Sequence, residues 1–415
     1  MSNLQIDPQR LWDSLMDTAR VGGLPGGGIA RLTLTQDDKT IRDWFRGEVE
    51  ALGMTVTVDD MGNMFALRAG LDPSLPPIAI GSHLDTQPTG GKFDGNLGVL
   101  AGLEVMRTLQ ATGYVTRAPL MLVNWTNEEG ARFLPAMLGS GVYAGAYTQD
   151  FAYNRTDPDG VRFEDALDGI AYRGPVAAGA VPLGAMFELH IEQGPILEAE
   201  KTIIGVVQGV QGMRWFDITL TGQASHTGTT PMHLRRNALL GAARLIQDVD
   251  AIALAHAPTA VGTVGFLVVS PNSYNVIPGE VALTVDLRDP DAGVLEAMES
   301  ALETAVAAIR QDFGLEVAVK PVARTAPVVF DAGCIAAVRH AAQKSGYSTR
   351  DIVSGAGHDA VHAAAVMPTT MIFVPSAGGL SHNEAEFTDQ GECGAGAQVL
   401  LDAVLHYDSR AEAAN

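Results

Sequence analysis

The stretch Pro77-Ile-Ala-Ile-Gly-Ser-His83-Leu-Asp85-Thr86 joins a short apolar run to polar residues that follow it directly. Such a run is typical of a buried β-strand, and in α/β sheets the groups that bind ligands follow strands of this kind. Similar segments recur at Pro119–Trp125 and Ala185–His190, and an apolar helix is predicted at about Leu97–Leu109. Strands that alternate with helices predict an α/β fold, with a mixed, mostly parallel sheet and helices on both faces.

The pattern changes near Gln208, where a second kind of domain is predicted. Its expected elements are strand Arg214–Leu220, helix Arg235–Asp250, strands Val261–Val269 and Glu280–Leu287, helix Ala292–Asp312 and strand Leu315–Val319. This β-α-β-β-α-β order is ferredoxin-like. We therefore expect a larger domain of residues 1–211 and 327–415, interrupted by a smaller α+β domain of residues 212–326. Glycines at 209 and 212 are a predicted hinge.

Composition limits the classes of partner. The 415 residues are enough for about two domains, and a formal charge of −21 argues against nucleic acid and anionic membranes as partners. No apolar run approaches the roughly 18 residues that span a bilayer, and no secretory signal is evident, so a cytoplasmic location is expected. Because the protein is acidic, an anionic substrate would have to be captured by a local positive charge, such as a metal ion or an arginine. The only two cysteines, Cys334 and Cys393, exclude a cysteine-based zinc site.

Candidate metal ligands begin with His83 and Asp94, which precede the predicted helix at Leu97. If the strand continues past His83, Asp85 points the same way and could orient the imidazole ring. Asp94, in the loop before the helix, could offer both carboxylate oxygens to metals. The alternative for this segment is a surface histidine with solvated turn aspartates.

Adjacent carboxylates follow the second strand, at Glu128 and Glu129. They are costly to desolvate unless a cation compensates them, so one could bind metal while the other takes a proton from the attacking water. An isolated Glu-Glu pair is more often solvated, and a lone histidine is more often structural. The ensemble outweighs these alternatives, because five nitrogen and oxygen ligands suited to two divalent ions follow predicted strands: His83, Asp94, Glu129, His190 and His382.

The motifs G-S-H-L-D-T, G-G-K-F-D-G, N-E-E-G-A-R-F, E-L-H-I-E-Q-G-P and the late S-H-N resemble the hydantoinase/carbamoylase family of amidases. That family includes N-carbamoyl-L-amino acid hydrolases, β-ureidopropionases and allantoate amidohydrolases, within the dinuclear-zinc aminoacylase and carboxypeptidase-like superfamily. The resemblance runs from about Leu11 to Val404. It implies a zinc-peptidase-like catalytic domain with an inserted lid and dimerisation domain.

The resemblance also implies roles for single residues. His83 and His190 would bind one metal, Glu129 and His382 the other, and Asp94 would bridge them. Glu128 would be the general base and Asp85 would support His83. Two divalent ions are expected, usually zinc, although manganese, cobalt or nickel can serve. Substrate contacts are implied for Gln193, Gly357 and His358. In the inserted domain, His226 would stabilise an oxyanion, often across a dimer interface, while Asn275 and Arg288 would hold the substrate carboxylate.

These implications predict a metal-dependent amidohydrolase that cleaves the carbamoyl C–N bond of an N-carbamoyl α- or β-amino acid, a small ureido acid, as a homodimer built through the lid domain. The alternatives are an allantoate amidohydrolase, an aminoacylase or dipeptidase, and a binding homologue without activity. Arg288 could instead pair with Asp286 or Asp289, and His226 could be an ordinary surface residue. Two positions depart from the family pattern: Asn237 replaces a common aspartate, and Asn96 stands beside Asp94 where apolar or small residues are frequent.

Overall fold

The computed structural model of the chain describes residues 4–410 and divides the chain into two compact units. The larger unit comprises the residues up to Gly209 and from Val329 onward, and the smaller unit comprises Val210–Val328. Both ends of the smaller unit lie within two residues of the predicted boundaries.

The larger unit is built on a nine-stranded sheet with the order β1-β2-β4-β3-β5-β15-β6-β13, in which β14 also pairs with β6. The central strands β4, β3, β5 and β15 are parallel, whereas β1, β2 and β6 pair antiparallel. The strands are β1 (Thr55–Val58), β2 (Met64–Arg68), β3 (Ile78–His83), β4 (Leu120–Trp125), β5 (Ala185–Ile191), β6 (Ile204–Val210), β13 (Val328–Val329), β14 (Thr349–Ser354) and β15 (Thr369–Val374).

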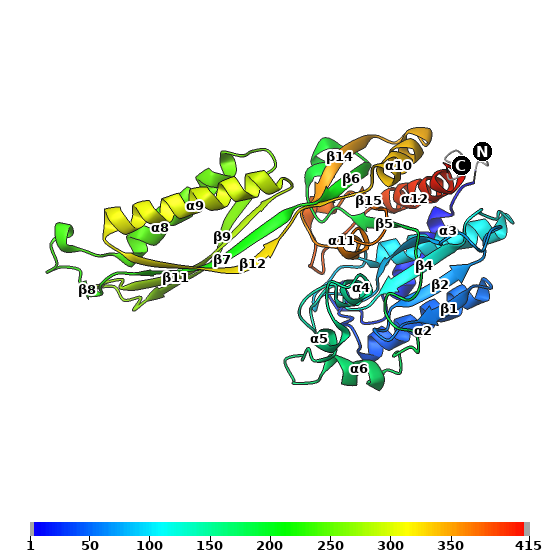
Figure 1. Cartoon of the computed structure of the whole chain (residues 1–415), viewed down its shortest axis with the longest axis horizontal. Coiled ribbons are helices and arrows are strands. Elements are labelled where there is room, and N and C mark those ends of the chain that lie inside the picture. The colour runs from blue at the N-terminus through cyan, green and yellow to red at the C-terminus, as the bar shows by residue number, and fades with distance from the viewer. Residues whose placement is uncertain (1–3, 411–415) are drawn as a thin grey trace. The chain divides into compact units, whose positions relative to one another are not determined.

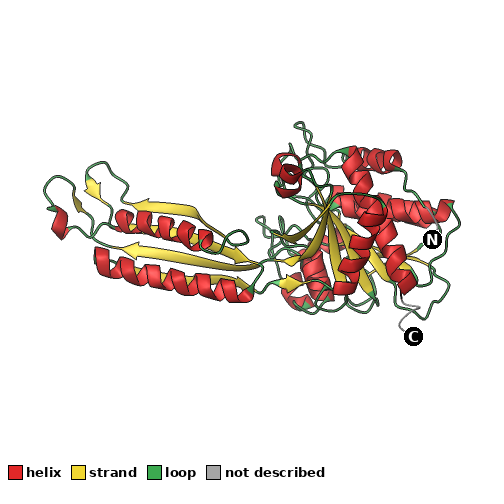
Figure 2. Cartoon of the chain, turned by 90° about the horizontal axis from the view of Figure 1, so that it is seen from above, coloured by secondary structure: helices red, strands yellow, loops and turns green. Residues whose placement is uncertain are grey.

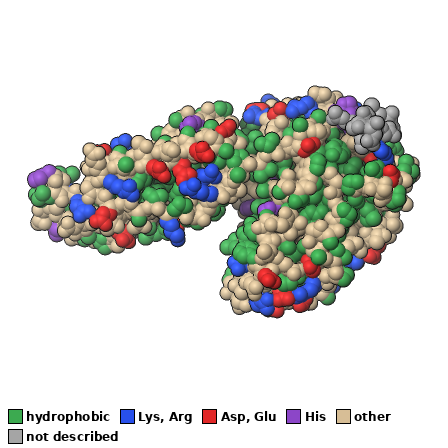
Figure 3. All heavy atoms as spheres, in the orientation of Figure 1, with side chains coloured by type: hydrophobic (Ala, Val, Ile, Leu, Met, Phe, Trp, Pro, Cys, Tyr) green, Lys and Arg blue, Asp and Glu red, His purple; other side chains and the backbone are tan. Residues whose placement is uncertain are grey.

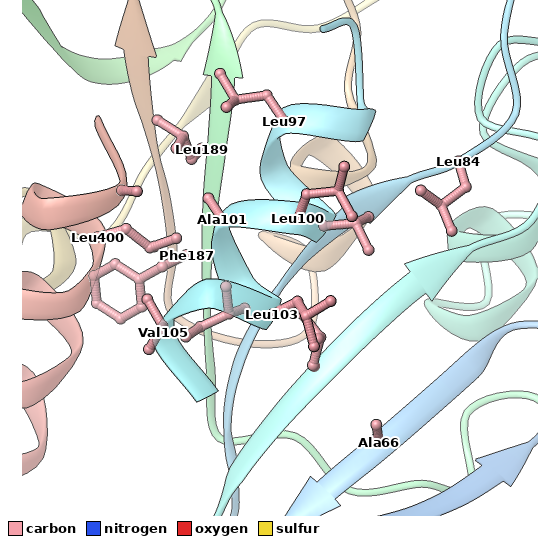
Figure 4. Packing of buried hydrophobic residues seen from close by; sticks show 14 of the residues in the cluster. Ala66, Leu84, Leu97, Leu100, Ala101, Leu103, Val105, Phe187, Leu189 and Leu400 are labelled. Carbon is pink, nitrogen blue, oxygen red and sulfur yellow. The ribbon is translucent and has the colours of Figure 1, made fainter. Parts of the chain in front are cut away.

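Helices cover both faces of this sheet (Figures 1 and 2). On one face α3 contacts β3 and β5, and it also packs against α1 and α12. Figure 4 shows Leu97, Ala101 and Val105 of α3 beside Phe187 and Leu189 of β5. The helices are α1 (Pro8–Thr18), α2 (Gln36–Ala51), α3 (Asn96–Ala111), α4 (Leu138–Tyr143), α5 (Gln149–Tyr153), α6 (Phe163–Gly169), α7 (Ile196–Glu200), α10 (Ala332–Lys344), α11 (Asp359–Ala363) and α12 (Gln390–Arg410), with a 3-10 turn η2 (Ala377–Gly379).

The smaller unit is an antiparallel sheet of order β12-β7-β11-β9 with two helices on one face (Figure 1). Along β11 the side chains alternate, and Val281, Leu283, Val285 and Leu287 are buried in the core with the helices. Figure 3 shows acidic and basic side chains intermixed on the face of this unit that it presents. The elements are β7 (Gly212–Thr221), β8 (Ser225–His226), η1 (Met232–Leu234), α8 (Ala238–Leu254), β9 (Val261–Ser270), β10 (Val276–Ile277), β11 (Glu280–Asp289), α9 (Ala292–Phe313) and β12 (Glu316–Thr325).

The predicted fold class is confirmed. The larger unit has the mixed sheet with a parallel centre, and the smaller one has the ferredoxin-like order of elements and strands. The sequence patterns did not predict β1 and β2, which extend the sheet beyond β4, or β6, β13 and β14, which extend it beyond β15. Within residues 4–410, no helix combines the length and apolar character needed to cross a membrane.

Candidate metal centre and active site

The candidate ligands meet at the carboxyl ends of the parallel strands. His83 is the last residue of β3, Glu128 and Glu129 follow β4, and His190 lies near the end of β5. His382 follows β15 after the turn η2. Because parallel strands end at the same edge of a sheet, segments far apart in sequence deliver their side chains to one place.

Asp94 lies in the middle of these residues. Its Oδ1 is 3.6 Å from Nε2 of His83 and 3.1 Å from Nε2 of His190. Its Oδ2 is 3.4 Å from Nε2 of His382, and that nitrogen is 3.4 Å from Oε2 of Glu129. Two groups of ligand atoms result, each with all atoms within 4.8 Å of one another: His83, Asp94 and His190, and Asp94, Glu129 and His382. The two groups share Asp94, which presents one oxygen to each.

The two buried histidines are oriented by backbone carbonyls. Nδ1 of His83 lies 2.9 Å from the carbonyl oxygen of Asp85, and Nδ1 of His190 lies 2.8 Å from that of Ile191. A carbonyl can only accept, so Nδ1 carries the proton in each ring. In the neutral ring, Nε2 then offers a lone pair on the side of Asp94, as a metal ligand requires.

The predicted role of Asp85 needs a correction. Strand β3 ends at His83, so the alternation of a strand does not extend to Asp85. Its Oδ1 is 3.9 Å from Nδ1 of His83, beyond hydrogen-bond distance, and its backbone carbonyl orients the ring instead. The carboxylate accepts the backbone N–H groups of Glu128 and Glu129, each at 3.3 Å. Asp85 therefore links the segments after β3 and β4.

Gly95 allows the segment of Asp94 to pass close to the histidines. Its φ is +65°, a conformation that favours glycine. A Cβ at this position would lie 2.3 Å from the ring of His83. Its backbone N–H is 3.2 Å from Nε2 of His190. Any other residue here would displace either α3 or the ring of His83.

Burial and mutual repulsion dominate the acid–base properties of the site. Burial, with the charges of Asp359 and Glu129, raises the pKa of Glu128 well above its usual value, and burial with the charge of Asp94 does the same for Glu129. Burial disfavours the protonated form of His190 and lowers its pKa. The hydrogen bond to Asp94 outweighs this effect, so the pKa of His190 is raised to about 9. Burial lowers the pKa of His83 to about 4. The excess of buried carboxylates creates an environment that a cation would stabilise.

Two residues at the site were missed by the sequence analysis. Oε1 of Glu386 accepts the backbone N–H groups of Phe93 and Asp94, each at 3.1 Å, and Oε2 accepts Ser381 Oγ at 3.0 Å. Gln87 donates to both carboxylate oxygens of Glu129, from its backbone N at 3.1 Å and its Nε2 at 2.8 Å. In the sequence, only their positions next to predicted motifs could have indicated these two residues. Gln87 follows the His83 motif, and Glu386 lies four residues after His382.

Gln193 and His358 adjoin the metal-ligand candidates in different ways. Nε2 of Gln193 donates to Asp94 Oδ2 at 2.8 Å, while its Oε1 is buried and has no hydrogen-bond partner among the described residues. The ring of His358 packs edge-on against His190 with 4.5 Å between centroids, and its Nε2 is 3.0 Å from Ser354 Oγ. A Cβ on neighbouring Gly357 would lie 3.1 Å from Cε of Met137. The ring of His358 is thus buried against that of His190, and its contact with a substrate stays a prediction.

The three candidates in the smaller unit do not form one cluster. His226 pairs with Val276 between β8 and β10, and Thr227 N donates to the Asn275 carbonyl at 3.1 Å, so His226 and Asn275 are neighbours. Arg288 lies near the other end of β11, eight residues beyond Glu280. At about 3.3 Å per residue this is roughly 26 Å along the strand. Within one chain, Asn275 and Arg288 therefore cannot hold the same carboxylate.

Known proteins resemble the whole chain. The model of the family described as Peptidase family M20/M25/M40 matches residues 79–406. An N-carbamoyl-L-amino-acid amidohydrolase of Rhizobium meliloti is 51% identical, with 97% of each chain covered. An allantoate amidohydrolase of Bacillus subtilis (strain 168) is 33% identical and covers 92% of this chain and 94% of its own. A crystal structure of an amidase of the hydantoinase/carbamoylase family from Burkholderia multivorans superimposes with a TM-score of 0.96, 52% identity and coverage of 98% and 99%.

Proposed function

The chain belongs to peptidase family M20/M25/M40, and we propose that it hydrolyses the carbamoyl C–N bond of an N-carbamoyl amino acid. The products are ammonia, carbon dioxide and the free amino acid. Family membership and the amidohydrolase relatives confirm the resemblance seen in the sequence, and with it the prediction of a hydrolase that acts on amides. The substrate proposal depends on Gln193, whose buried Oε1 has no hydrogen-bond partner among the described residues. Gln193 lies beside the two groups of candidate metal ligands that share Asp94.

The residues around Asp94 fit two divalent ions. His83 and His190 would hold one ion, Glu129 and His382 the other, and Asp94 both. Nε2 of His83 is buried without a hydrogen-bond partner, which is costly unless a ligand completes it. Imidazole and carboxylate donors suit zinc, and also manganese, cobalt or nickel. When bound, such ions polarise the scissile carbonyl and acidify the attacking water.

Glu128 is placed to act as the general base. It is buried, and its Oε2 lies 3.3 Å from Nε2 of His83, next to the candidate ligand groups. In the metal-free protein, burial and the charges of Asp359 and Glu129 raise the pKa of this carboxyl well above its usual value. Glu128 would take a proton from the attacking water and return it to the nitrogen of the leaving amine.

Gln193 supports a carbamoyl group over an acyl group at the site. A carbamoyl NH₂ can donate to the unpartnered Oε1 of Gln193, whereas the methyl of an acetyl group cannot. An acyl substrate would leave this buried acceptor unsatisfied, which costs about 1–3 kcal/mol. Aminoacylase activity is therefore the weaker alternative. Allantoate also carries terminal ureido NH₂ groups, so an allantoate amidohydrolase, the name of the 33% identical relative, remains the second candidate.

In a homodimer, Asn275 of one subunit and Arg288 of the other would reach the same substrate, although the two residues lie far apart in a single chain. We propose that Arg288 acts on the substrate of its own subunit, while His226 and Asn275 reach the site of the partner. Strand β9 is an edge strand, and it exposes Phe266 and Val268. Helix α8, which packs against β9, exposes Leu240 and Leu254. An unpaired apolar edge of this kind is suited to pairing with a second copy.

A substrate panel tests the proposed function. Protein loaded with Zn²⁺ or Mn²⁺ is incubated with an N-carbamoyl-L-α-amino acid, N-carbamoyl-β-alanine, allantoate and the matching N-acetyl amino acid. We expect the fastest turnover on a carbamoyl amino acid, with ammonia released, and loss of turnover after chelation. Faster release of the amino acid from the N-acetyl compound would contradict the proposal, as would turnover that persists in the metal-free protein.

A further inference from the structure

Arg31 is a fully buried cation held by uncharged acceptors. Its Nε donates to the carbonyl of Leu84 at 2.8 Å. Its Nη1 donates to the carbonyls of Thr18 at 3.0 Å and Val21 at 3.1 Å, and its Nη2 donates to Oδ1 of Asn96. Within residues 4–410, no carboxylate lies at ion-pair distance from it, which is rare for a buried arginine.

Retention of this charge indicates a specific role for Arg31. Burial lowers its pKa to about 10, but Asp38 and Asp85 oppose this effect, so the guanidinium stays charged at neutral pH. Burial of a cation without a paired anion is unfavourable for folding. All of its acceptors are carbonyl or amide oxygens, and two of them belong to the segments that carry His83 and Asp94.

Asn96 connects Arg31 to Asp94. While its Oδ1 accepts from Arg31, its Nδ2 donates to the backbone carbonyl of Asp94 at 3.0 Å. Arg31 also exchanges two hydrogen bonds with Thr86, from Arg31 N to Thr86 Oγ1 at 2.8 Å and from Thr86 N to the Arg31 carbonyl at 2.9 Å. Arg31 and Asn96 thus restrain two segments. One follows β3 and His83, and the other precedes α3 and carries Asp94.

We propose that Arg31 and Asn96 form a positioning pair that sets the distance between His83 and Asp94, and thereby the metal affinity and the turnover of the enzyme. An apolar side chain at position 96 would leave a guanidinium N–H without an acceptor and would release the Asp94 carbonyl. The inference rests on the metal centre of the proposed function. Neither residue touches the reacting atoms, so both act through the ligands.

Metal affinity is the readout that separates positioning from stability. We compare Asn96→Ala, Arg31→Lys and their double variant with the wild type, by competition for Zn²⁺ with a chromophoric chelator and by separate measurement of kcat and KM. The control is Asn124→Ala, a buried asparagine on β4 whose Nδ2 forms its only hydrogen bond, among the described residues, with Met64 Sδ at 3.7 Å. Arg31→Lys keeps the charge, so it tests the pair even if Asn96→Ala does not fold.

We expect Asn96→Ala and Arg31→Lys to weaken Zn²⁺ binding about 10- to 100-fold, as loss of groups behind metal ligands does elsewhere. We expect kcat to fall with KM nearly unchanged, and the double variant to lose little more than either single one. Asn124→Ala should lower only the melting temperature. If both single variants keep the wild-type Zn²⁺ affinity and kcat, or lose no more than Asn124→Ala does, the positioning role of Arg31 and Asn96 is refuted. The proposed function would not be affected by that result. A wild type that binds no Zn²⁺ would instead overturn the proposed function and this inference with it.

Discussion

Arg288 and Asp286 form a bidentate ion pair two residues apart on β11. Nε of Arg288 lies 3.0 Å from both oxygens of Asp286, and Nη2 lies 2.8 Å from Oδ2. Both side chains are partly exposed on the face of the sheet opposite the helices. The pairing that the sequence left as an alternative for Arg288 is thus present. Asp286 also holds the guanidinium in one orientation, so a substrate carboxylate would meet an ordered group.

Replacement of Arg288 by lysine tests this role. Lysine keeps the charge but cannot form two parallel hydrogen bonds. If a charge-assisted hydrogen bond is worth about 1.5–3 kcal/mol, KM should rise roughly 10- to 100-fold. We expect kcat to change less. Steady-state kinetics of Arg288→Lys beside Arg244→Lys, an exposed arginine paired with Asp248 on α8, give the comparison. An unchanged KM would refute a substrate contact at Arg288.

Complementation between subunits tests the proposed dimer. Arg288→Ala and Asn275→Ala should each lose most activity at low substrate concentration. If the two residues serve one site from different subunits, mixed dimers contain one intact site. Random exchange would restore about a quarter of wild-type activity, because half of the dimers are hybrids with one working site each. Hybrids detected by mass spectrometry without recovered activity would contradict the arrangement.

Glu128→Gln tests the general base. The amide retains the shape of the side chain but cannot accept the proton, so kcat should fall about 10²- to 10⁴-fold. Metal content should stay at the wild-type level, since Glu129 is the proposed ligand. Metal analysis and kcat measured on the same preparation decide the point. Turnover close to that of the wild type would remove Glu128 from the reaction.

The stabilising effect of metal should grow with pH. In the metal-free protein, burial and the charge of Asp94 raise the pKa of Glu129, and the pKa of His190 is raised to about 9. For groups with a raised folded pKa, the stabilising contribution is fully present below the unfolded pKa and is lost as pH rises through the folded pKa. The bound protons must also leave before a metal can bind. Zn²⁺ should therefore raise the melting temperature more at pH 8 than at pH 5.5.

One variant at the site and one control extend this experiment. Glu129→Gln removes one of the two titrating groups and also a proposed metal ligand, so both the size and the pH dependence of the Zn²⁺ effect should be reduced. Gln208→Ala changes a glutamine on β6 whose Nε2 bonds the carbonyl of Val206, and it should leave that dependence intact. An equal rise in melting temperature at both pH values in the wild type would exclude proton displacement from these groups.

Glu386 should affect metal binding without contact to the metal. Its carboxylate holds the backbone of Asp94 and joins it to Ser381, next to His382. Glu386→Ala removes this link and should weaken Zn²⁺ binding roughly 10-fold. The matched control is Glu384→Gln, which alters a partly exposed residue of the same loop. Chelator competition checks both variants, and equal affinities in the two would show that Glu386 has no positioning role.

Much of the site was predictable because its residues follow apolar strands in short, local patterns. His83, Glu129 and His190 could be placed from the alternation of strands and helices alone, since parallel strands end at one edge. The role of Asp85 could not, because it depends on where β3 ends. The same is true of Glu386 and Gln87, whose partners are set by loop conformations rather than by periodicity.

The order of amino acids is enough to infer the two kinds of domain, the strand ends that carry the candidate site residues and the family to which the chain belongs. These features depend on local hydrophobic periodicity and on motifs of a few residues. The packed fold was needed to establish which carbonyls orient the histidines, that Arg31 joins the segments of His83 and Asp94, and that Asn275 and Arg288 lie far apart in one chain. Such relations join residues distant in sequence, and they follow from how the elements pack, which no local pattern records.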